Sequence, residues 1–357
     1  MRIAVIALFW LVLLGVLYWT RRSRNVIFWP LLALACLLMY NLIFTPQFYV
    51  LDIRSASDGY REGVSGLPYL YGVPIDIINH ASKVGILALG MTLVIAVGGI
   101  DLSVGAVMAI AGAMMAALFV QMGRPPEQCI AAALIVGVIA GMWNGFLVAV
   151  MGIPPMVATL ILMVAGRGVA QLITDGQIII FNNPTLNYIG NGFLVIPFPF
   201  ILMLIMFALT LLLTKCTAVG FMIESVGDNE IAARRAGLNS RLIKFLVYVF
   251  AGFCAAVAGL VATSNIRSAD ANNIGLNLEL DAIMSVVIGG TAMTGGRFYL
   301  ASSVVGAILI QTLTTTMYAK DVSPVVAPVP KALVILAVCL LQSERVKRYL
   351  AGRREAV

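Results

Sequence analysis

The stretch VIAVGGIDLSVGAVMAIAGA, residues 94–113, decides the fold class of this sequence. It is apolar enough to lie in a membrane, yet two adjacent glycines and an aspartate interrupt it. Gly98 and Gly99 allow the chain to leave a helix, because glycine adopts backbone conformations that other residues avoid. The stretch therefore predicts two membrane helices that are separated by a break.

Asp101 has two interpretations at this break. Its side chain can accept a hydrogen bond from the amide of Ser103 or Val104 and so cap the helix that follows. Irregular backbone at membrane depth is tolerated only where protein or a water-filled cavity covers it. Asp101 therefore either caps the second helix alone, or caps it and also lines a polar route through the membrane.

The composition extends this prediction to the whole chain. Of the 357 residues, 61% are hydrophobic and 11% are charged, and the mean hydropathy is +1.01. A soluble domain has about a quarter of its residues charged. The sequence therefore predicts an all-α polytopic protein in the lipid bilayer. The net charge of +7 comes mostly from short basic segments between apolar runs, which indicates membrane topology and no nucleic-acid partner.

Eleven apolar segments are candidates for spanning helices, each of which needs about 20 residues for a full crossing. They are residues 3–20, 26–44, 78–97, 103–121, 129–150, 156–173, 195–214, 245–263, 281–291, 299–318 and 330–342. Segments 281–291 and 330–342 are shorter than a full crossing.

The basic residues orient these segments. Most of the 23 lysines and arginines fall in the connections 21–24, 215–244 and 345–354. Because cytoplasmic loops carry an excess of basic residues, these connections and the C-terminus should be cytoplasmic. The first apolar segment has its basic residues after it, which favours a spanning helix over a cleaved signal peptide. The predicted organisation is an extra N-terminal spanning helix with a basic turn (1–25), the main bundle (26–343) and a basic cytoplasmic tail (344–357).

The connection 215–244 contains DNEIAARRAGL, a pattern typical of a short helix with both ends marked. Asp228 or Asn229 can cap the first amides. Glu230 lies in the first turn, where the helix dipole favours an acid. Gly237 suits the left-handed position just past the end.

The last turn of this short helix holds Arg234 and Arg235, again as the dipole favours. Ala232, Ala233 and Ala236 predict a small-residue surface. The helix either inserts into a groove on another protein or only closes the loop.

A second glycine-interrupted region, IGGTAMTGGR, occupies residues 288–297. Paired interrupted spans in the two halves of a transporter point to its translocation site. Asn144 and Arg167 add polar groups inside apolar runs, where a buried polar side chain needs a partner or a water-filled cavity. The candidate pathway residues are Gly98, Gly99, Asp101, Ser103, Asn144, Arg167, Gly289, Gly290, Thr291, Gly295 and Gly296. The glycines at 137, 141 and 145 recur every four residues, which predicts close helix packing.

Several functional classes lack their sequence signatures. The phosphate-binding pattern GxxxxGK[ST] is absent, and no paired carboxylates lie inside the spans. His80 is the only histidine, and the five cysteines form no CxxC motif or Cys/His cluster. We therefore expect no catalytic residue, no metal and no cofactor bound by this chain. The small number of ionisable residues in the spans argues against an ion-coupled carrier, because such a carrier must bind or release its ion there.

Three stretches together carry a family resemblance. Residues 87–113, 226–244 and 278–297 resemble the permease subunits of bacterial ribose-type monosaccharide ABC importers, and the first looks most like the galactofuranose branch of that family. The resemblance implies a type II importer core of about ten spans in the bacterial inner membrane. It also implies that a monosaccharide similar to galactofuranose, galactose or ribose is imported. The alternative is an ion-coupled secondary sugar transporter.

The resemblance also implies partners. They are a separate ATPase that binds ATP and Mg²⁺, a periplasmic sugar-binding protein and a second permease copy, either identical or a close paralogue. In this family the short cytoplasmic helix couples the permease to the ATPase. The corresponding residues here are Glu224, Gly227, Asp228, Asn229, Glu230, Ala232, Ala233, Arg234 and Gly237.

Overall fold

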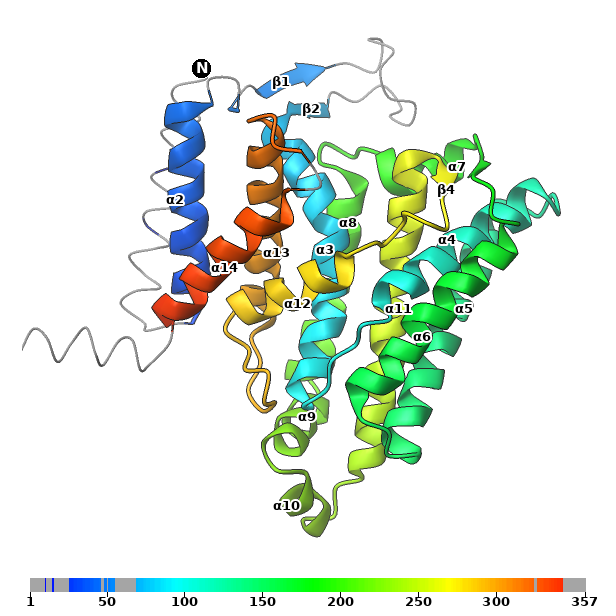
Figure 1. The fold of residues 1–357 in the computed structure, drawn as a ribbon, viewed down its shortest axis with the longest axis vertical. Coiled ribbons are helices and arrows are strands. Elements are labelled where there is room, and N and C mark those ends of the chain that lie inside the picture. The colour runs from blue at the N-terminus through cyan, green and yellow to red at the C-terminus, as the bar shows by residue number, and fades with distance from the viewer. Residues whose placement is uncertain are drawn as a thin grey trace, which may run out of the picture.

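The computed structural model describes residues 10, 15, 26–45, 48–49, 51–54, 69–323 and 326–342. Within these ranges the chain forms a bundle of helices with two small sheets (Figure 1). The predicted helix over 3–20 lies almost wholly outside the described residues, and the predicted tail over 344–357 lies entirely outside them.

The main helices coincide with ten of the eleven predicted segments. Their bounds are α2 Phe28–Phe44, α3 Val73–Ala96, α4 Val104–Val120, α5 Pro126–Gly145 with a π-helical extension Phe146–Val150, α6 Pro155–Ile173, α8 Phe198–Lys215, α11 Ser240–Ile266, α12 Leu278–Ile288, α13 Leu300–Tyr318 and α14 Pro328–Gln342. Six of the described helices are long and apolar enough to cross a membrane. The protein is therefore an all-α multi-pass membrane protein, as predicted.

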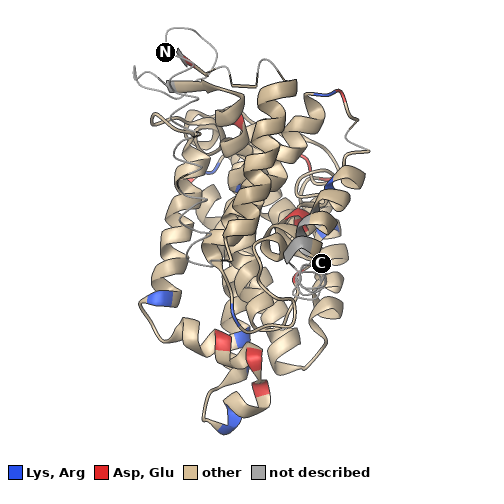
Figure 2. Cartoon of the chain, turned by 90° about the vertical axis from the view of Figure 1, so that its left-hand side faces the viewer, with Lys and Arg blue, Asp and Glu red and all other residues tan. Residues whose placement is uncertain are grey.

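Shorter elements lie at the two ends of the bundle. They are α7 (Pro184–Asn191), α9 (Val219–Asp228), α10 (Glu230–Arg235), the antiparallel pair β1 (Leu51–Arg54) and β2 (Tyr69–Gly72), and the antiparallel pair β3 (Ile179–Ile180) and β4 (Ser268–Ala269). Figure 1 shows β1, β2 and α7 at one end and α9 and α10 at the other. Figure 2 shows charged residues gathered at the α9–α10 end, below helices with few charges. This is the end that the sequence predicts to be cytoplasmic.

Helices α3 and α11 form the centre of the bundle. Their most apolar 18-residue windows are 83% and 72% buried, against 22% for α6 and 28% for α8. Helix α5 packs closely on α11 through the predicted glycine row. A Cβ atom on Gly141 would lie 2.5 Å from the Tyr248 carbonyl oxygen. Cβ atoms on Gly137 and Gly145 would also lie within 3 Å of atoms of α11. The central helices can therefore approach because small residues line their contact.

Two breaks interrupt the bundle, and both occur at the predicted positions. Residues 97–103 separate α3 from α4, and residues 289–299 separate α12 from α13. Gly98 and Gly290 have φ angles of +77° and +84°, a backbone region that favours glycine. Helix α12 has 11 residues and so a length of about 16 Å, about half of the hydrocarbon core.

Candidate functional site

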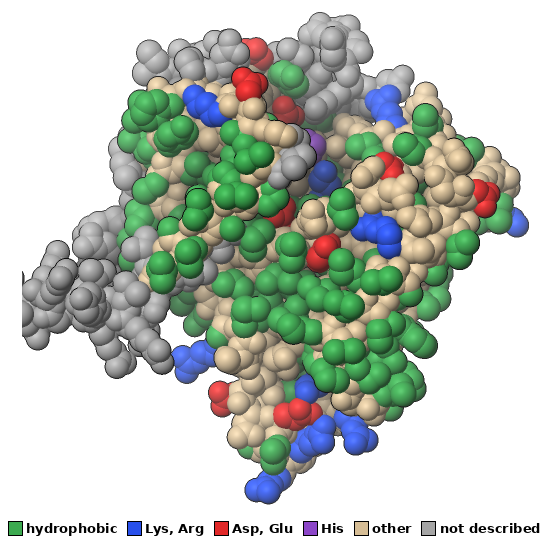
Figure 3. All heavy atoms as spheres, in the orientation of Figure 1, with side chains coloured by type: hydrophobic (Ala, Val, Ile, Leu, Met, Phe, Trp, Pro, Cys, Tyr) green, Lys and Arg blue, Asp and Glu red, His purple; other side chains and the backbone are tan. Residues whose placement is uncertain are grey.

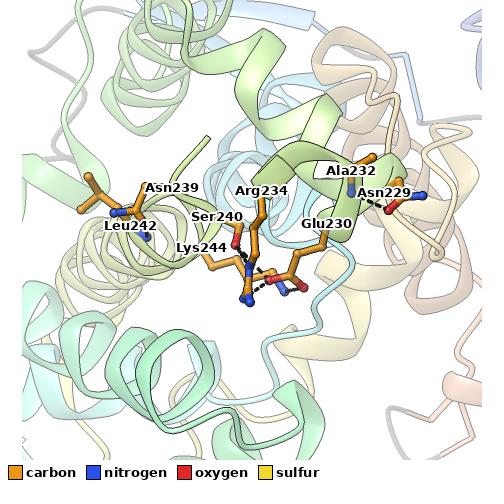
Figure 4. Close-up of polar contacts among 8 residues, drawn as sticks. All are labelled: Asn229, Glu230, Ala232, Arg234, Asn239, Ser240, Leu242 and Lys244. Atoms are coloured by element: carbon orange, nitrogen blue, oxygen red, sulfur yellow. Dashed lines mark hydrogen bonds and ion pairs between the residues drawn. The ribbon is translucent and has the colours of Figure 1, made fainter. Parts of the chain in front are cut away.

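Helix α10 forms as the sequence predicts. The Asn229 side chain accepts a hydrogen bond from the amide of Ala232 at 3.0 Å, so Asn229 and not Asp228 is the cap. Gly237 has a φ of +89° just past the end of the helix. Figure 4 shows this short helix beside the start of α11.

Glu230 ties α10 to α11. Its carboxylate accepts from Arg234 Nη2 at 2.7 Å, from Lys244 Nζ at 2.6 Å and from Ser240 Oγ at 3.1 Å (Figure 4). Partial burial acts to raise the pKa of Glu230. The hydrogen bonds and charges of these neighbours outweigh that effect and hold the pKa below its ordinary value. The carboxylate thus stays ionised and fixes the orientation of α10.

The exposed face of α10 differs from the predicted one. Ala233 is 5% exposed and packs inward, so its assignment to a partner-facing surface is wrong. Ala232 is exposed, but the larger exposed groups are Ile231 and Phe221, at 67% and 71%. Neither residue was predicted from the sequence. Both large apolar side chains lie on the short helices α9 and α10 at the charged end of the bundle.

Gly227 of α9 meets the last residue of α3 and the second break. A Cβ atom at Gly227 would lie 1.8 Å from the Ala96 carbonyl oxygen and 2.5 Å from the Gly296 amide nitrogen. The Gly296 amide donates to that same carbonyl at 2.9 Å. At Gly295, a Cβ atom would lie 2.8 Å from the Gly227 carbonyl oxygen and 3.0 Å from the Gly98 nitrogen. The structure therefore brings the three stretches that carry the family resemblance into one place.

The other predicted coupling residues lie around this contact. Asp228 is exposed, and its side chain is close to Gly296. Glu224 is partly exposed on α9. Gly295 and Gly296, which were predicted as pathway residues, thus lie against α9 at the charged end of the bundle, and Gly98 lies beside Gly295.

Asp101 anchors the first break. It is 2% exposed and accepts from the Ser103 amide at 2.9 Å and from Ser103 Oγ at 2.6 Å. Helix α4 begins at Val104 with Ser103 at the N-cap position and no side-chain cap bond. The predicted hydrogen bond from the Ser103 amide forms, but Asp101 lies two residues before the N-cap and so holds the break without capping α4 itself. Asn144 Nδ2 donates to Ser103 Oγ at 2.8 Å, and Thr159 Oγ1 donates to the carbonyl of Ile100 at 3.3 Å. These bonds join the break to α5 and α6.

Tyr248 of α11 closes the same break from the other side. It is fully buried, and a Cβ atom on Gly99 would lie 2.5 Å from its hydroxyl oxygen. Gly99 is therefore required for close packing. Tyr248 was not predicted as a site residue. Its polar hydroxyl inside the apolar run 245–263 is the signal in the sequence that could have identified it.

The second break is held mainly by backbone. A Cβ atom on Gly289 would lie 2.8 Å from the amide nitrogen of Ser303 on α13. Thr291 Oγ1 accepts from the Tyr299 amide at 3.2 Å. Thr92 Oγ1 of α3 donates to Ser303 Oγ of α13 at 2.9 Å, which links the helix before the first break to the helix after the second.

Arg167 lies apart from the other candidate residues. Its Nη1 atom donates to the carbonyls of Ala271 at 3.0 Å and Ile274 at 2.6 Å. It borders an open cavity of about 400 Å³ that Glu279 also lines. Arg167 thus fixes the segment between β4 and α12 onto α6.

Comparison with known proteins places this geometry in context. Residues 73–341 match the family described as branched-chain amino acid transport system / permease component. The galactofuranose transporter permease protein YtfT of Escherichia coli (strain K12) is 50% identical over 91% of this chain and 94% of its own length. The fructose import permease protein FruF of Bifidobacterium longum (strain NCC 2705) is 38% identical, covering 91% and 90%. The ribose import permease protein RbsC of Bacillus subtilis (strain 168) is 37% identical, covering 76% and 86%. No solved structure matches the chain.

Proposed function

The chain belongs to the permease family described as branched-chain amino acid transport system / permease component, and we propose that it is the transmembrane permease of an ATP-binding cassette importer for a monosaccharide. It would lie in the bacterial inner membrane with its C-terminus in the cytoplasm. The charged end of the bundle at α9 and α10 supports this orientation. The chain itself would bind no cofactor, and ATP with Mg²⁺ would bind to a separate ATPase.

The substrate class rests on the relatives. The family description names branched-chain amino acids, whereas relatives at 50%, 38% and 37% identity are named for galactofuranose, fructose and ribose. A sequence identity of 50% over 91% of the chain says more about the substrate than the description of a whole family does. A sugar is therefore the proposed substrate, with galactofuranose or galactose as the first candidates to test.

The contact of Gly227 with Ala96, at the end of α3, and with Gly296, in the second break, carries the mechanistic part of the proposal. Helix α10 and the exposed Phe221 and Ile231 would dock on the ATPase. Movement of α9 would then act on Ala96 and Gly296 together, because no space remains between Gly227 and either residue. The coupling residues Glu224, Asp228, Asn229, Glu230, Ala232, Arg234 and Gly237 surround this contact.

The remaining partners follow from the same function. A periplasmic sugar-binding protein would deliver the substrate at the end that carries β1, β2 and α7. A second permease copy, identical or paralogous, would complete the membrane part. Asp101, Ser103 and Asn144 would support the broken segment along the route of the sugar.

Reconstitution tests this proposal. The permease is expressed with the ATPase and the binding protein encoded beside it, and the uptake of labelled galactose, fructose, ribose and leucine into vesicles is measured. ATP-dependent uptake of a sugar and not of leucine is expected. Uptake of leucine alone, or sugar uptake driven by an ion gradient without ATP, would contradict the proposal.

The docking part has its own measurement. Ile231→Asp should lower the amount of ATPase that co-purifies with the permease, because a charge replaces an exposed apolar contact. Ile178→Asp is the matched control. Ile178 is 57% exposed, against 67% for Ile231, and it lies directly before β3, away from α9 and α10. Equal ATPase recovery with both variants would show that α10 is not the contact.

A further inference from the structure

A cavity of about 780 Å³ lies between α3, α12, α13 and the start of α14. This volume is within the range of about 300–1,000 Å³ that is usual for small-molecule sites. The cavity lies away from α9 and α10, and Figure 3 shows charged side chains set into the hydrophobic surface around the level of α12. Its polar lining includes His80, Lys83, Asn277, Asp281, Gln311 and Lys331.

The cavity contains a nearly buried ion pair. Lys331 Nζ lies 3.0 Å from Asp281 Oδ2 and 3.2 Å from Oδ1, and the two side chains are 14% and 15% exposed. Asp281 is in the first turn of α12, where the helix dipole favours an acid. Lys331 is in the first turn of α14, where the dipole disfavours a cation. A buried ion pair also gives little net stability compared with apolar residues of the same size. Helix stability therefore does not account for Lys331.

A second charged group faces the same cavity. Lys83 Nζ lies 3.3 Å from Nδ1 of His80, one helical turn away on α3. An ammonium group can only donate, so the ring nitrogen accepts. The ammonium has three donors in all, so Lys83 can make further hydrogen bonds inside the cavity. Ionisable residues in membrane segments mark substrate pathways, because lipid makes them costly elsewhere.

We propose that this cavity binds the hydroxyl groups of the monosaccharide during its passage, an assignment that rests on the proposed function. A sugar hydroxyl is both a donor and an acceptor. Asp281 accepts from one hydroxyl, while Lys83 and Lys331 donate to others. Apolar neighbours such as Ile283 and Met284 contact the carbon face of the ring.

Sugar protection of a cysteine measures occupancy of the cavity. Leu280 lines the cavity and is 48% exposed, so Leu280→Cys, in a background without other cysteines, is accessible to a thiol reagent. The probe is whichever of galactose, fructose or ribose the unaltered complex transports. The sugar should slow alkylation. With Lys83→Met, about 10- to 100-fold more sugar should be needed, which corresponds to loss of one hydrogen bond to a charged group.

Charge reversal separates sugar binding from a structural role. Asp281→Lys with Lys331→Asp restores an ion pair in the opposite sense. The amount of permease in the membrane should recover relative to either single variant. Sugar uptake should stay at least about tenfold below that of the unaltered protein, because loss of one hydrogen bond to a charged group has an effect of that size. Asp321→Asn is a matched control, because Asp321 is exposed in the turn after α13, and it should keep full uptake.

The outcomes distinguish the two proposals. Sugar uptake by the unaltered complex without cysteine protection, or full uptake by the charge-reversed protein, would overturn the cavity assignment alone. Absence of sugar uptake by the unaltered complex would overturn the proposed function, and the cavity assignment with it.

Discussion

The two breaks in the bundle are held in different ways. Side chains hold residues 97–103, because Asp101, Ser103 and Asn144 form a buried hydrogen-bonded chain that reaches α5. Backbone contacts hold residues 289–299, where Gly296 packs against Gly227 and Ala96. The first break is thus anchored to the bundle, whereas the second is attached to α9.

This difference suggests separate roles in coupling. Ala96 is the last residue of α3, directly before the anchored break. A movement of α9 would shift Ala96 and Gly296 together, while Asp101 remains fixed to α5. Residues 97–100 therefore lie between the end of α3 that meets α9 and the segment that Asp101 and Ser103 hold to α5.

Replacing Gly227 should have the largest effect. In Gly227→Val the new side chain would overlap the Ala96 carbonyl, and such overpacking costs about 1–3 kcal/mol. We expect loss of uptake and of sugar-stimulated ATP hydrolysis, with a lowered unfolding temperature in detergent. Gly168→Val is the matched control, since Gly168 is helical with open space around its Cβ position. Equal activity of both variants would refute the role of Gly227.

Asp101 should show the next largest effect, and it tests the anchored break. Asp101→Ala leaves the buried Ser103 amide without its acceptor and should cost about 1–3 kcal/mol of unfolding free energy. Asp101→Asn keeps an acceptor oxygen and should unfold near the wild-type temperature. If both variants are stable but neither supports uptake, the anchoring role is contradicted and pathway lining is favoured instead.

Glu230 should show the smallest effect. Glu230→Gln weakens contacts to Arg234 and Lys244 that are partly exposed, so the loss should not exceed about 1 kcal/mol. The folded-state pKa of Glu230 is lower than its ordinary value of 4.5. The contribution of the Glu230 carboxylate to the unfolding free energy is therefore present above pH 4.5. It is lost as the pH falls through the folded-state pKa. The difference in unfolding free energy between wild type and Glu230→Gln should shrink below about pH 4.5, and a constant difference would contradict this.

Local patterns made much of this architecture predictable. Long apolar runs located ten of the helices. The cap at Asn229 and the left-handed Gly237 followed from chemistry within one turn, and the glycine row of α5 followed from its spacing. The contact between Asp101 and Ser103 was predictable for the same reason, because its atoms lie two residues apart.

Long-range contacts were not predictable in the same way. Gly227, Ala96 and Gly296 are far apart in the sequence, and glycine carries no side-chain chemistry that could identify its partner. The inward orientation of Ala233 was missed because a six-residue helix of small and charged residues has no clear apolar face. Tyr248 lies in an apolar run, where its position opposite Gly99 depends on how α11 packs.

Distances between spin labels test the central claim that α9 and the second break move together. Labels at Ala218→Cys, beside α9, and Met293→Cys, in the second break, form one pair in a background without other cysteines. Ala218→Cys and Met151→Cys, after α5, form the control pair. When the ATPase is trapped with ATP and vanadate, the first distance should stay constant and the second should change. A change in the first distance while the second stays constant would contradict the account.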